Sequence, residues 1–164
     1  MTVVEAYRIA TTGASGQVGS AVLRQDPEVN KITARFDQGL ETLVDELDHV
    51  RPQRLINGAA YTQVDQAESE QTIAHVVNAN AVGALSTWCK TANSELIHFS
   101  TDYVFDGQAK QPYRENDPPS PINVYGHTKL AGERAIQHSQ CRGLIIRTSW
   151  VLGHPGRNFV TTIL

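Results

Sequence analysis

The sequence predicts an α/β protein: a Rossmann-like, doubly wound parallel sheet with helices on both faces. Short apolar runs of strand length alternate with amphipathic stretches of helix length, which is the pattern of successive βαβ units. A glycine-rich turn also follows the first apolar run and precedes the first amphipathic stretch. At 164 residues and 40% hydrophobic, the chain can bury one core, so we expect a single domain over residues 1–164.

Each element is predicted from its own pattern. Apolar runs predict strands at residues 8–12, 31–36, 54–59, 95–105 and 143–150. Apolar residues at helical spacing predict helices at 17–24, 40–50, 71–91 and 123–138. Trp88 lies on the apolar stripe of the longest helix, so we expect it in the core. Residues 112–121 carry four of the seven prolines and are predicted to be a loop.

The last residues resemble the first turns of an amphipathic helix without a C-terminal cap signal. Residues 158–164 read NFVTTIL, with Phe159, Val160 and Ile163 as the apolar positions. We therefore expect the chain to stop before a C-terminal substrate-binding part, and we expect weak or absent turnover from these 164 residues by themselves.

Charge and cysteine usage narrow the class of protein. The formal charge of −3 argues against a nucleic-acid-binding protein, which would carry a basic face. No apolar run is long enough for a membrane span, and the N-terminus lacks a signal-peptide pattern. Cys89 and Cys141 are isolated thiols, and the histidines share no ligand-like spacing, so we expect no disulfide and no metal site. These features favour a cytoplasmic protein without a membrane partner.

The glycine turn reads TTGASGQVG at residues 11–19. Gly13 can adopt the positive φ of a tight turn, Gly16 lets a pyrophosphate approach the backbone, and Gly19 lets the helix pack closely. The helix N-terminus would offer free N–H groups to the phosphates. The turn favours a dinucleotide site over a plain strand-to-helix connection.

The residues that distinguish NADPH from NADH should lie about 20 positions beyond the glycines. Arg35 could meet a 2′-phosphate, and Asp37 could accept a hydrogen bond from a 2′-hydroxyl. Either could equally be an ordinary solvated charge, so the sequence leaves the choice of cofactor open.

Tyr125 and Lys129 lie four residues apart on a predicted helix and therefore share one face. A lysine beneath a tyrosine is expected to lower the pKa of the phenol, so that it can give its proton to a carbonyl oxygen. Thr101 and Asp102 end a predicted parallel strand, where ligand crevices form. Together these groups fit a nicotinamide-dependent carbonyl reductase.

At this level of detail the chain resembles the extended short-chain dehydrogenase/reductases, and within them the rhamnose-pathway branch. The likeness runs over nearly the whole chain and rests on GASGQVG (13–19), NGAAYTQVDQAESE (57–70), STDYVFDG (100–107), PINVYGHTKLAGE (121–133) and RTSWVLG (147–153). The resemblance implies reduction of the C4 ketone of dTDP-4-dehydro-L-rhamnose to dTDP-L-rhamnose with NADPH or NADH. It also implies a nucleotide-sugar substrate, and it leaves a homo-oligomer and a magnesium ion open.

The resemblance assigns roles to individual residues. Thr101 matches the hydroxyl that hydrogen-bonds the reacting oxygen, Tyr125 the proton donor, and Lys129 the residue that holds the nicotinamide ribose. The positions that match cofactor contacts are Gly16, Gln17, Val18, Arg35, Phe36, Ala60, Tyr61, Thr62 and Phe99. Asp102 and Trp150 match sugar-nucleotide contacts. On sequence alone, Trp150 is equally consistent with core packing.

Several features separate this chain from neighbouring groups. Nucleotide-sugar dehydratases carry Thr-Asp-Glu where this chain has Tyr103 in third place, so elimination lacks its acid. The region between the second strand and the second helix is short, and Arg35 stands where an acid is often found. Asn78 matches an asparagine that ties its helix to neighbouring backbone, although a plain surface amide is an equal interpretation. The alternative function is a non-catalytic, cofactor-binding regulatory or scaffolding subunit.

Overall fold

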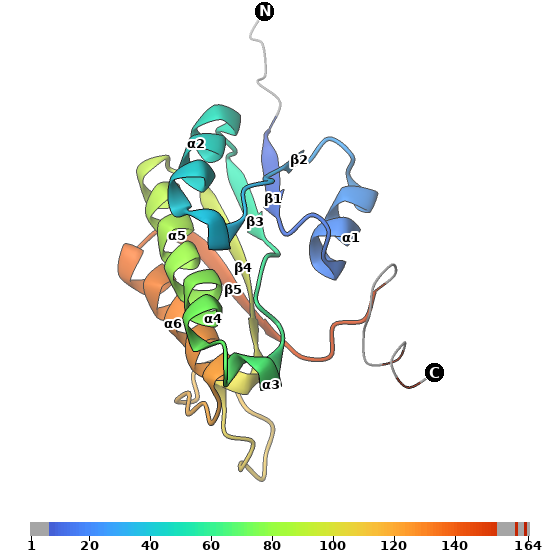
Figure 1. Cartoon of the computed structure of the whole chain (residues 1–164), viewed down its shortest axis with the longest axis vertical. Coiled ribbons are helices and arrows are strands. Elements are labelled where there is room, and N and C mark those ends of the chain that lie inside the picture. The colour runs from blue at the N-terminus through green and yellow to red at the C-terminus, as the bar shows by residue number, and fades with distance from the viewer. Residues whose placement is uncertain (1–6, 154–159, 161–162, 164) are drawn as a thin grey trace, which may run out of the picture.

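The computed structural model describes residues 7–153 together with residues 160 and 163. Within these residues, five parallel strands form one sheet in the order β2-β1-β3-β4-β5 (Figure 1). The strands are β1 Ile9–Thr12, β2 Asn30–Lys31, β3 Arg54–Asn57, β4 Glu95–Thr101 and β5 Arg142–Thr148. The chain steps from β1 to β2 in one direction and then builds β3 to β5 in the other. The order therefore reverses between β1 and β3, which is where such sheets form a ligand crevice.

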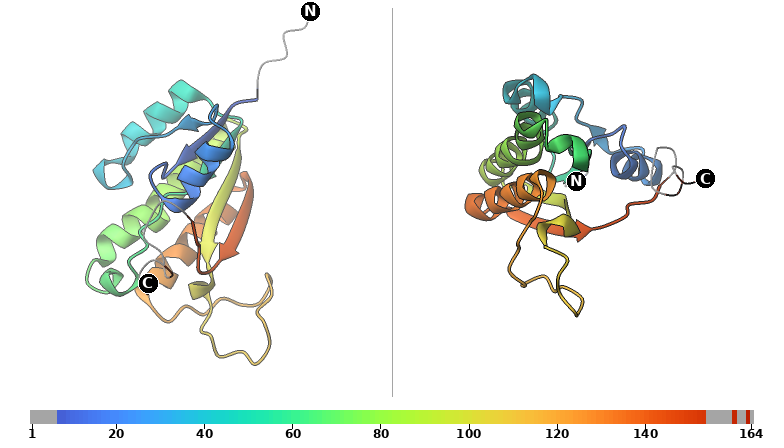
Figure 2. Two further views of the ribbon diagram at one scale, coloured as in Figure 1. Left: turned by 90° about the vertical axis from the view of Figure 1, so that its right-hand side faces the viewer. Right: turned by 60° about the horizontal axis from the view of Figure 1, so that its bottom comes forward.

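Helices cover both faces of the sheet. Helix α1 (Gln17–Gln25) lies on one face, and the opposite face carries α2 (Leu40–Val50), α5 (Ala81–Thr91) and α6 (Val124–Ser139) (Figures 1 and 2). Two short helices, α3 (Val64–Ala67) and α4 (Gln71–His75), precede α5. The predicted fold class is confirmed, and the two layers of helices are unequal among the described residues.

The core lies between the sheet and the layer formed by α2, α5 and α6. Each central strand contributes one fully buried aliphatic side chain, namely Ala10, Leu55 and Leu96. The helices meet them with Leu43, Leu47, Val82, Leu85, Trp88 and Ile136. Trp88 is 8% exposed, which confirms its predicted place in the core. No helix in the described part of the chain is long and apolar enough to cross a membrane.

The predicted second strand at 31–36 is wrong beyond Lys31. The amide of Ile32 still donates to the Thr11 carbonyl at 2.9 Å, but the next two amides turn to a side chain. Both Thr33 and Ala34 donate their N–H groups to the Glu46 carboxylate on α2, at 2.9 and 2.8 Å. Because a carboxylate satisfies these donors, the chain leaves the sheet after two residues.

The predicted helix at 71–91 contains a π-helical turn, η2, at Val76–Asn80. Asn78 lies on this turn and is 1% exposed. Its amide accepts from the Tyr61 N–H at 2.9 Å and donates to the Tyr61 carbonyl at 3.0 Å and to Thr128 Oγ1 at 3.1 Å. Asn78 is therefore the tie between helix and neighbouring backbone, and the surface-amide interpretation is wrong.

The third and fourth strands end earlier than predicted, at Asn57 and Thr101. Thr101 Oγ1 accepts from the Tyr103 N–H at 3.2 Å, which opens the 3₁₀ turn η3 at Asp102–Val104 in place of further strand. The last predicted helix, at 158–164, lies largely outside the described residues.

Candidate active site

The glycine turn packs tightly against the end of β3. Gly13 has φ +64°, and a Cβ there would lie 2.6 Å from the Ala59 nitrogen. At Gly19 a Cβ would lie 2.3 Å from the Gly13 carbonyl oxygen, so the first turn of α1 sits directly on the loop. Gly16 is the N-cap of α1 and supplies no side-chain cap. The first N–H groups of α1 are thus presented at the carboxyl end of the sheet, as an anion site requires.

Two hollows meet at this turn. The first, of about 720 Å³, lies between the turn, the exit from β2 and the end of β3. The second, of about 950 Å³, extends over the ends of β4 and β5 to the start of α6. Both are lined by Ser15, Gly16, Gly58 and Ala60. Their sizes are those of small-molecule sites.

This arrangement fits a dinucleotide. Such a cofactor has two nucleoside ends joined by a pyrophosphate, and here two hollows join where α1 presents its N-terminus. A Cβ at Gly16 would approach only the Gly13 carbonyl oxygen, at 3.3 Å, and would otherwise enter the junction. The residues present can therefore hold the phosphates at the backbone of Gly16 and Gln17.

Tyr125 stands on the first turn of α6. Asn123 caps this helix by accepting from the Gly126 N–H at 2.7 Å, which fixes where the helix begins. The Tyr125 and Tyr103 rings meet edge to face, with centroids 5.6 Å apart and planes at 77°. Tyr125 and Thr101 line the second hollow together.

The pKa of Tyr125 corrects a sequence expectation. Burial raises the pKa of this phenol, a hydrogen bond with Thr101 lowers it, and the nearby Asp102 raises it further. The net shift is upward, whereas a lysine beneath the ring was expected to lower it. The reason is geometric, because Lys129 turns its Nζ towards β4 and donates to the Phe99 carbonyl at 2.6 Å.

Lys129 is itself deeply buried, at 2% exposed. Burial lowers the pKa of its ammonium to about 8, and Glu133 opposes that shift. The Nζ also lies 3.4 Å from Nε2 of His98, which is fully buried on β4. The lysine therefore joins the second hollow to the interior of the sheet.

A buried ion pair holds α6 against the two strands beside it. Glu133 accepts from Ser100 Oγ at 2.5 Å and from Arg147 Nε and Nη2 at 2.9 and 2.6 Å. Its side chain is 1% exposed, so the carboxylate is compensated almost entirely by these donors. Glu133 lies one turn beyond Lys129, and the contact fixes the helix that carries Lys129 and Tyr125.

In the first hollow, Arg35 and Asp37 pair with each other. Arg35 Nε and Nη2 donate to the Asp37 carboxylate at 3.0 and 2.6 Å, and both residues line the first hollow. The carboxylate raises the pKa of Arg35, and the guanidinium lowers the pKa of Asp37. The 2′-hydroxyl or 2′-phosphate of a cofactor in this hollow would therefore meet a guanidinium that already pairs with a carboxylate.

The structure brings most of the predicted site residues to these two hollows. The first is lined by Gly13, Gly16, Arg35, Phe36, Ala60 and Tyr61. The second is lined by Gly16, Gln17, Val18, Ala60, Thr62, Phe99, Thr101, Asp102, Tyr125, Lys129 and Trp150. Gly19 lines neither, because it packs α1 onto the turn, and Phe36 belongs mainly to the core at 6% exposed.

Trp150 is 67% exposed and follows β5 with φ +50°. The interpretation as a core residue is therefore wrong, and Trp150 lines the second hollow. Among the described residues, no group of histidine, cysteine and acidic side chains could hold a metal ion.

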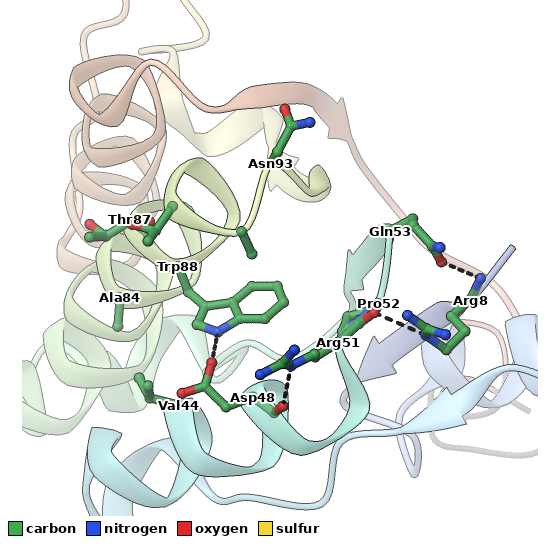
Figure 3. A pocket seen from close by; sticks show the side chains of 12 residues that line it. Arg8, Val44, Asp48, Arg51, Pro52, Gln53, Ala84, Thr87, Trp88 and Asn93 are labelled. Carbon is green, nitrogen blue, oxygen red and sulfur yellow. Dashed lines mark hydrogen bonds between the residues drawn. The ribbon is translucent and has the colours of Figure 1, made fainter. Parts of the chain in front are cut away.

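A third hollow, of about 820 Å³, lies at the opposite edge of the sheet between the ends of α2 and α5 (Figure 3). Trp88 Nε1 donates there to Asp48 Oδ1 at 2.8 Å, and Arg51 Nε donates to the Asp48 carbonyl at 3.2 Å. None of the predicted site residues lines it. The residues with predicted catalytic or binding roles lie at the carboxyl ends of the strands instead.

A family model described as the RmlD substrate binding domain matches residues 7–164. The chain belongs to this family. The chain is 42% identical to the dTDP-4-dehydrorhamnose reductase of Burkholderia thailandensis, over 96% of this chain and 54% of that protein. It is 40% identical to the dTDP-4-dehydrorhamnose reductase of Escherichia coli, over 93% of this chain and 54% of that one.

A solved structure supports the same family. The dTDP-4-dehydrorhamnose reductase of Bacillus anthracis, crystallised in complex with NADP, is similar with a TM-score of 0.87 at 35% identity. The similarity covers 96% of this chain and 58% of that one. The resemblance predicted from the motifs is confirmed, and the chain spans about half the length of the curated relatives it matches.

The sequence did not predict the residues that support the site from behind. Glu133 and Arg147 fall within motifs that carry the family resemblance but were given no role there, and His98 lies in a stretch that reads as an ordinary strand. One signal was present in the sequence: Glu133 follows Lys129 by four residues and so shares its buried face. His98 lies between apolar residues in the middle of a strand, which indicates burial and says nothing of its partner.

Proposed function

We propose that this chain is the cofactor-binding portion of a dTDP-4-dehydrorhamnose reductase, which reduces the C4 ketone of dTDP-4-dehydro-L-rhamnose to dTDP-L-rhamnose using NADPH or NADH. One observation carries the proposal. Thr101, Tyr125 and Lys129 line the second hollow, which joins, at Gly16, the first hollow, whose size suits a nucleoside. The similarity to proteins of that name supports the choice of substrate.

In this proposal the side chains of the second hollow act on the ketone oxygen. When bound, the nicotinamide supplies the hydride. Tyr125 donates its hydroxyl proton to the oxygen as negative charge develops there, and Thr101 holds the same oxygen by a hydrogen bond. A raised pKa keeps the Tyr125 phenol protonated at neutral pH, which is the form that a proton donor needs. Asp102 and Trp150 border the hollow where the sugar nucleotide would lie.

The remaining residues bind and orient the cofactor. The α1 N-terminus holds the pyrophosphate, and Arg35 borders the adenosine end. Lys129 stays largely protonated at pH 7, since its pKa is about 8, and its ammonium lies beside the hollow that would take the nicotinamide ribose. Phe36 offers only an edge because it is nearly buried.

The substrate pocket would be completed by chain beyond the described residues. The second hollow lies open beside Trp150, and the relatives are about twice as long as this chain. We therefore expect residues 1–164 to bind the cofactor and to turn over weakly or not at all. The free thiols of Cys89 and Cys141 fit a reducing, cytoplasmic setting.

Cofactor binding is the first test. Titration of NADPH and NADH fluorescence with the chain should show saturable binding, and Gly16→Ala should weaken it by about tenfold because a methyl group enters the phosphate junction. Gly83→Ala is the matched control, since its Cβ would make only an ordinary 3.6 Å contact with Ala135 on α6. Absence of saturable binding in the parent chain would refute the proposal.

Turnover is the second test and needs a chain of the relatives' full length. Tyr125→Phe should lower kcat by about 10²–10⁴ while NADPH affinity stays unchanged, because the variant removes the hydroxyl that donates the proton and little surface. If the parent binds NADPH yet never oxidises it with dTDP-4-dehydrorhamnose, the regulatory alternative gains and the reductase is excluded.

A further inference from the structure

A row of buried polar side chains runs behind the site and crosses three strands. It begins at Lys129 on α6, whose Nζ lies 3.4 Å from His98 Nε2 on β4. His98 Nδ1 lies 2.9 Å from Asn57 Nδ2 on β3. Asn57 Oδ1 in turn lies 2.6 Å from Thr12 Oγ1 on β1, immediately before the glycine turn. All four residues are at most 2% exposed, so the members of the row are one another's hydrogen-bonding neighbours.

The position of the proton on His98 follows from Asn57. Asn57 Oδ1 accepts from the Thr12 hydroxyl and, at 3.3 Å, from the Ala59 N–H, which also lies 3.3 Å from Thr12 Oγ1; in this arrangement the amide turns its Nδ2 donor towards His98. His98 Nδ1 is therefore an acceptor. A neutral imidazole carries one N–H, which places it on Nε2, facing the Lys129 Nζ. Burial and the lysine charge lower the pKa of His98 well below 6.5, so the ring stays neutral.

An Nε2–H group that faces Lys129 interacts differently with the ammonium form and the neutral amine form of the lysine. An ammonium has three donors and no lone pair, so it cannot accept from Nε2–H. A neutral amine has one lone pair and can accept while it still donates to the Phe99 carbonyl, 2.6 Å away. The imidazole therefore disfavours the protonated form of Lys129. It also limits where the lysine Nζ can lie.

We propose that His98 is a positioning residue for Lys129: its Nε2–H, aimed by the Asn57 amide, sets the place of the lysine Nζ and the ease with which Lys129 keeps its third proton. The inference rests on the proposed function in one respect only. If that function holds, the same row connects the active-site lysine to Thr12, the residue before the phosphate-binding turn. Among the described residues, the charged and titratable groups beside this pair are Glu133 with Arg147 of β5, and Tyr125 one turn earlier on α6.

The test begins with the unmodified chain and no cofactor. Long-range ¹H–¹⁵N spectra of the six histidines should show one ring protonated on Nε2 that does not titrate between pH 6 and 9. His98→Gln identifies that ring by removing its signals. If none of the six rings is protonated on Nε2 and free of titration in this range, the proposal is overturned without any need for a variant to fold; a ring assigned to His98 that is protonated on Nδ1 also overturns it.

The second measurement follows Lys129 directly. With ¹³C-labelled lysine the chain has four lysines, and Lys129→Met identifies the relevant signal. In the parent the Lys129 signal should titrate with a midpoint near pH 8. In His98→Gln an amide carbonyl can accept from the ammonium, so the midpoint should rise by about one unit. His127→Gln is the matched control. His127 is exposed on α6, the helix that carries Lys129, and its replacement should leave the Lys129 midpoint in place.

A purely structural role for His98 predicts a different result. His98→Gln would then lower the melting temperature and leave the Lys129 midpoint within about 0.2 units of the parent, which would refute the inference. Both measurements are made without cofactor, so they stand apart from the NADPH titration. Loss of NADPH binding in the parent would refute the proposed function and leave the His98 result intact.

Discussion

In the first hollow, two opposite charges lie side by side, Arg35 and Asp37. Asp37 holds the Arg35 guanidinium through two hydrogen bonds and places a negative charge beside it. NADPH would bring a 2′-phosphate to this corner, whereas NADH would bring a hydroxyl. The pair therefore weakens the attraction for the phosphate that Arg35 alone would exert.

Replacing Asp37 should consequently shift the choice of cofactor. Asp37→Asn removes the competing charge and should raise the ratio of NADPH to NADH affinity by about fivefold. Fluorescence titrations of both cofactors at one ionic strength measure this ratio. Asp45→Asn is the matched control, since it makes the same charge change on an exposed position of α2. An unchanged ratio in Asp37→Asn would show that the 2′-position is read elsewhere.

The sequence predicted which residues form the site better than it predicted the surroundings of their side chains. The motifs placed Thr101, Tyr125 and Lys129 together before the fold was known, and all three line one hollow. The direction of the Tyr125 pKa shift was wrong because it depends on where the Lys129 Nζ points and on burial, and neither is written in a four-residue spacing. The contact of His98 with Lys129 could not be predicted for the same reason, since the two residues come from different elements.

At the level of elements, α6 approaches the π turn so closely that only glycine fits between them. A Cβ at Gly132 would lie 2.3 Å from the carbonyl oxygen of Asn78. That carbonyl belongs to the turn that also ties Tyr61 and Thr128, so it cannot easily give way. The close approach sets the position of Lys129 and Tyr125 relative to the end of β3.

Two glycine-to-alanine changes should therefore have opposite signs. Gly132→Ala should lower the free energy of unfolding by about 1–3 kcal/mol through overpacking against the Asn78 carbonyl. Gly83→Ala on α5 should raise it by about 0.5–1 kcal/mol, because its Cβ meets only an ordinary contact and alanine favours the helix. Urea unfolding at pH 7 measures both. If Gly132→Ala proves as stable as the parent, the helix is not held by this contact.

The elements that the sequence misjudged share a cause. Local pattern placed β1, α1, α2 and α6 to within about two residues, because their apolar periodicity agrees with their tertiary contacts. It failed at β2, where the Glu46 carboxylate from α2 captures the amides of Thr33 and Ala34. It also missed the π turn at Val76–Asn80, whose shape accompanies the buried Asn78 bonds. In both places a long-range side chain decides the backbone.

Across the whole molecule, the charged groups of the interior make stability depend on pH in opposing ways. Lys129 has a pKa of about 8 in the fold against an ordinary 10.5. Between these values the unfolded chain binds a proton that the folded chain does not, so stability from this group rises with pH. Burial raises the pKa of the Cys89 thiol from 9.0 to about 12. That thiol contributes the opposite trend, since the unfolded chain loses its proton first.

Removing the lysine should isolate its share of this dependence. The difference in unfolding free energy between the parent and Lys129→Met should move by about 2 kcal/mol in favour of the parent from pH 7 to pH 9.5. Below pH 7 Lys129 is charged in both the folded and the unfolded chain, so the difference should be flat there.

Urea unfolding across this range measures the change, and the Cys89 contribution cancels because both chains carry that thiol. Lys110→Met, on an exposed loop, should follow the parent. A parent-minus-Lys129→Met difference that stays constant from pH 7 to 9.5 would mean that the buried lysine keeps its proton. The buried row from Lys129 to Thr12 would then need a different arrangement of hydrogens.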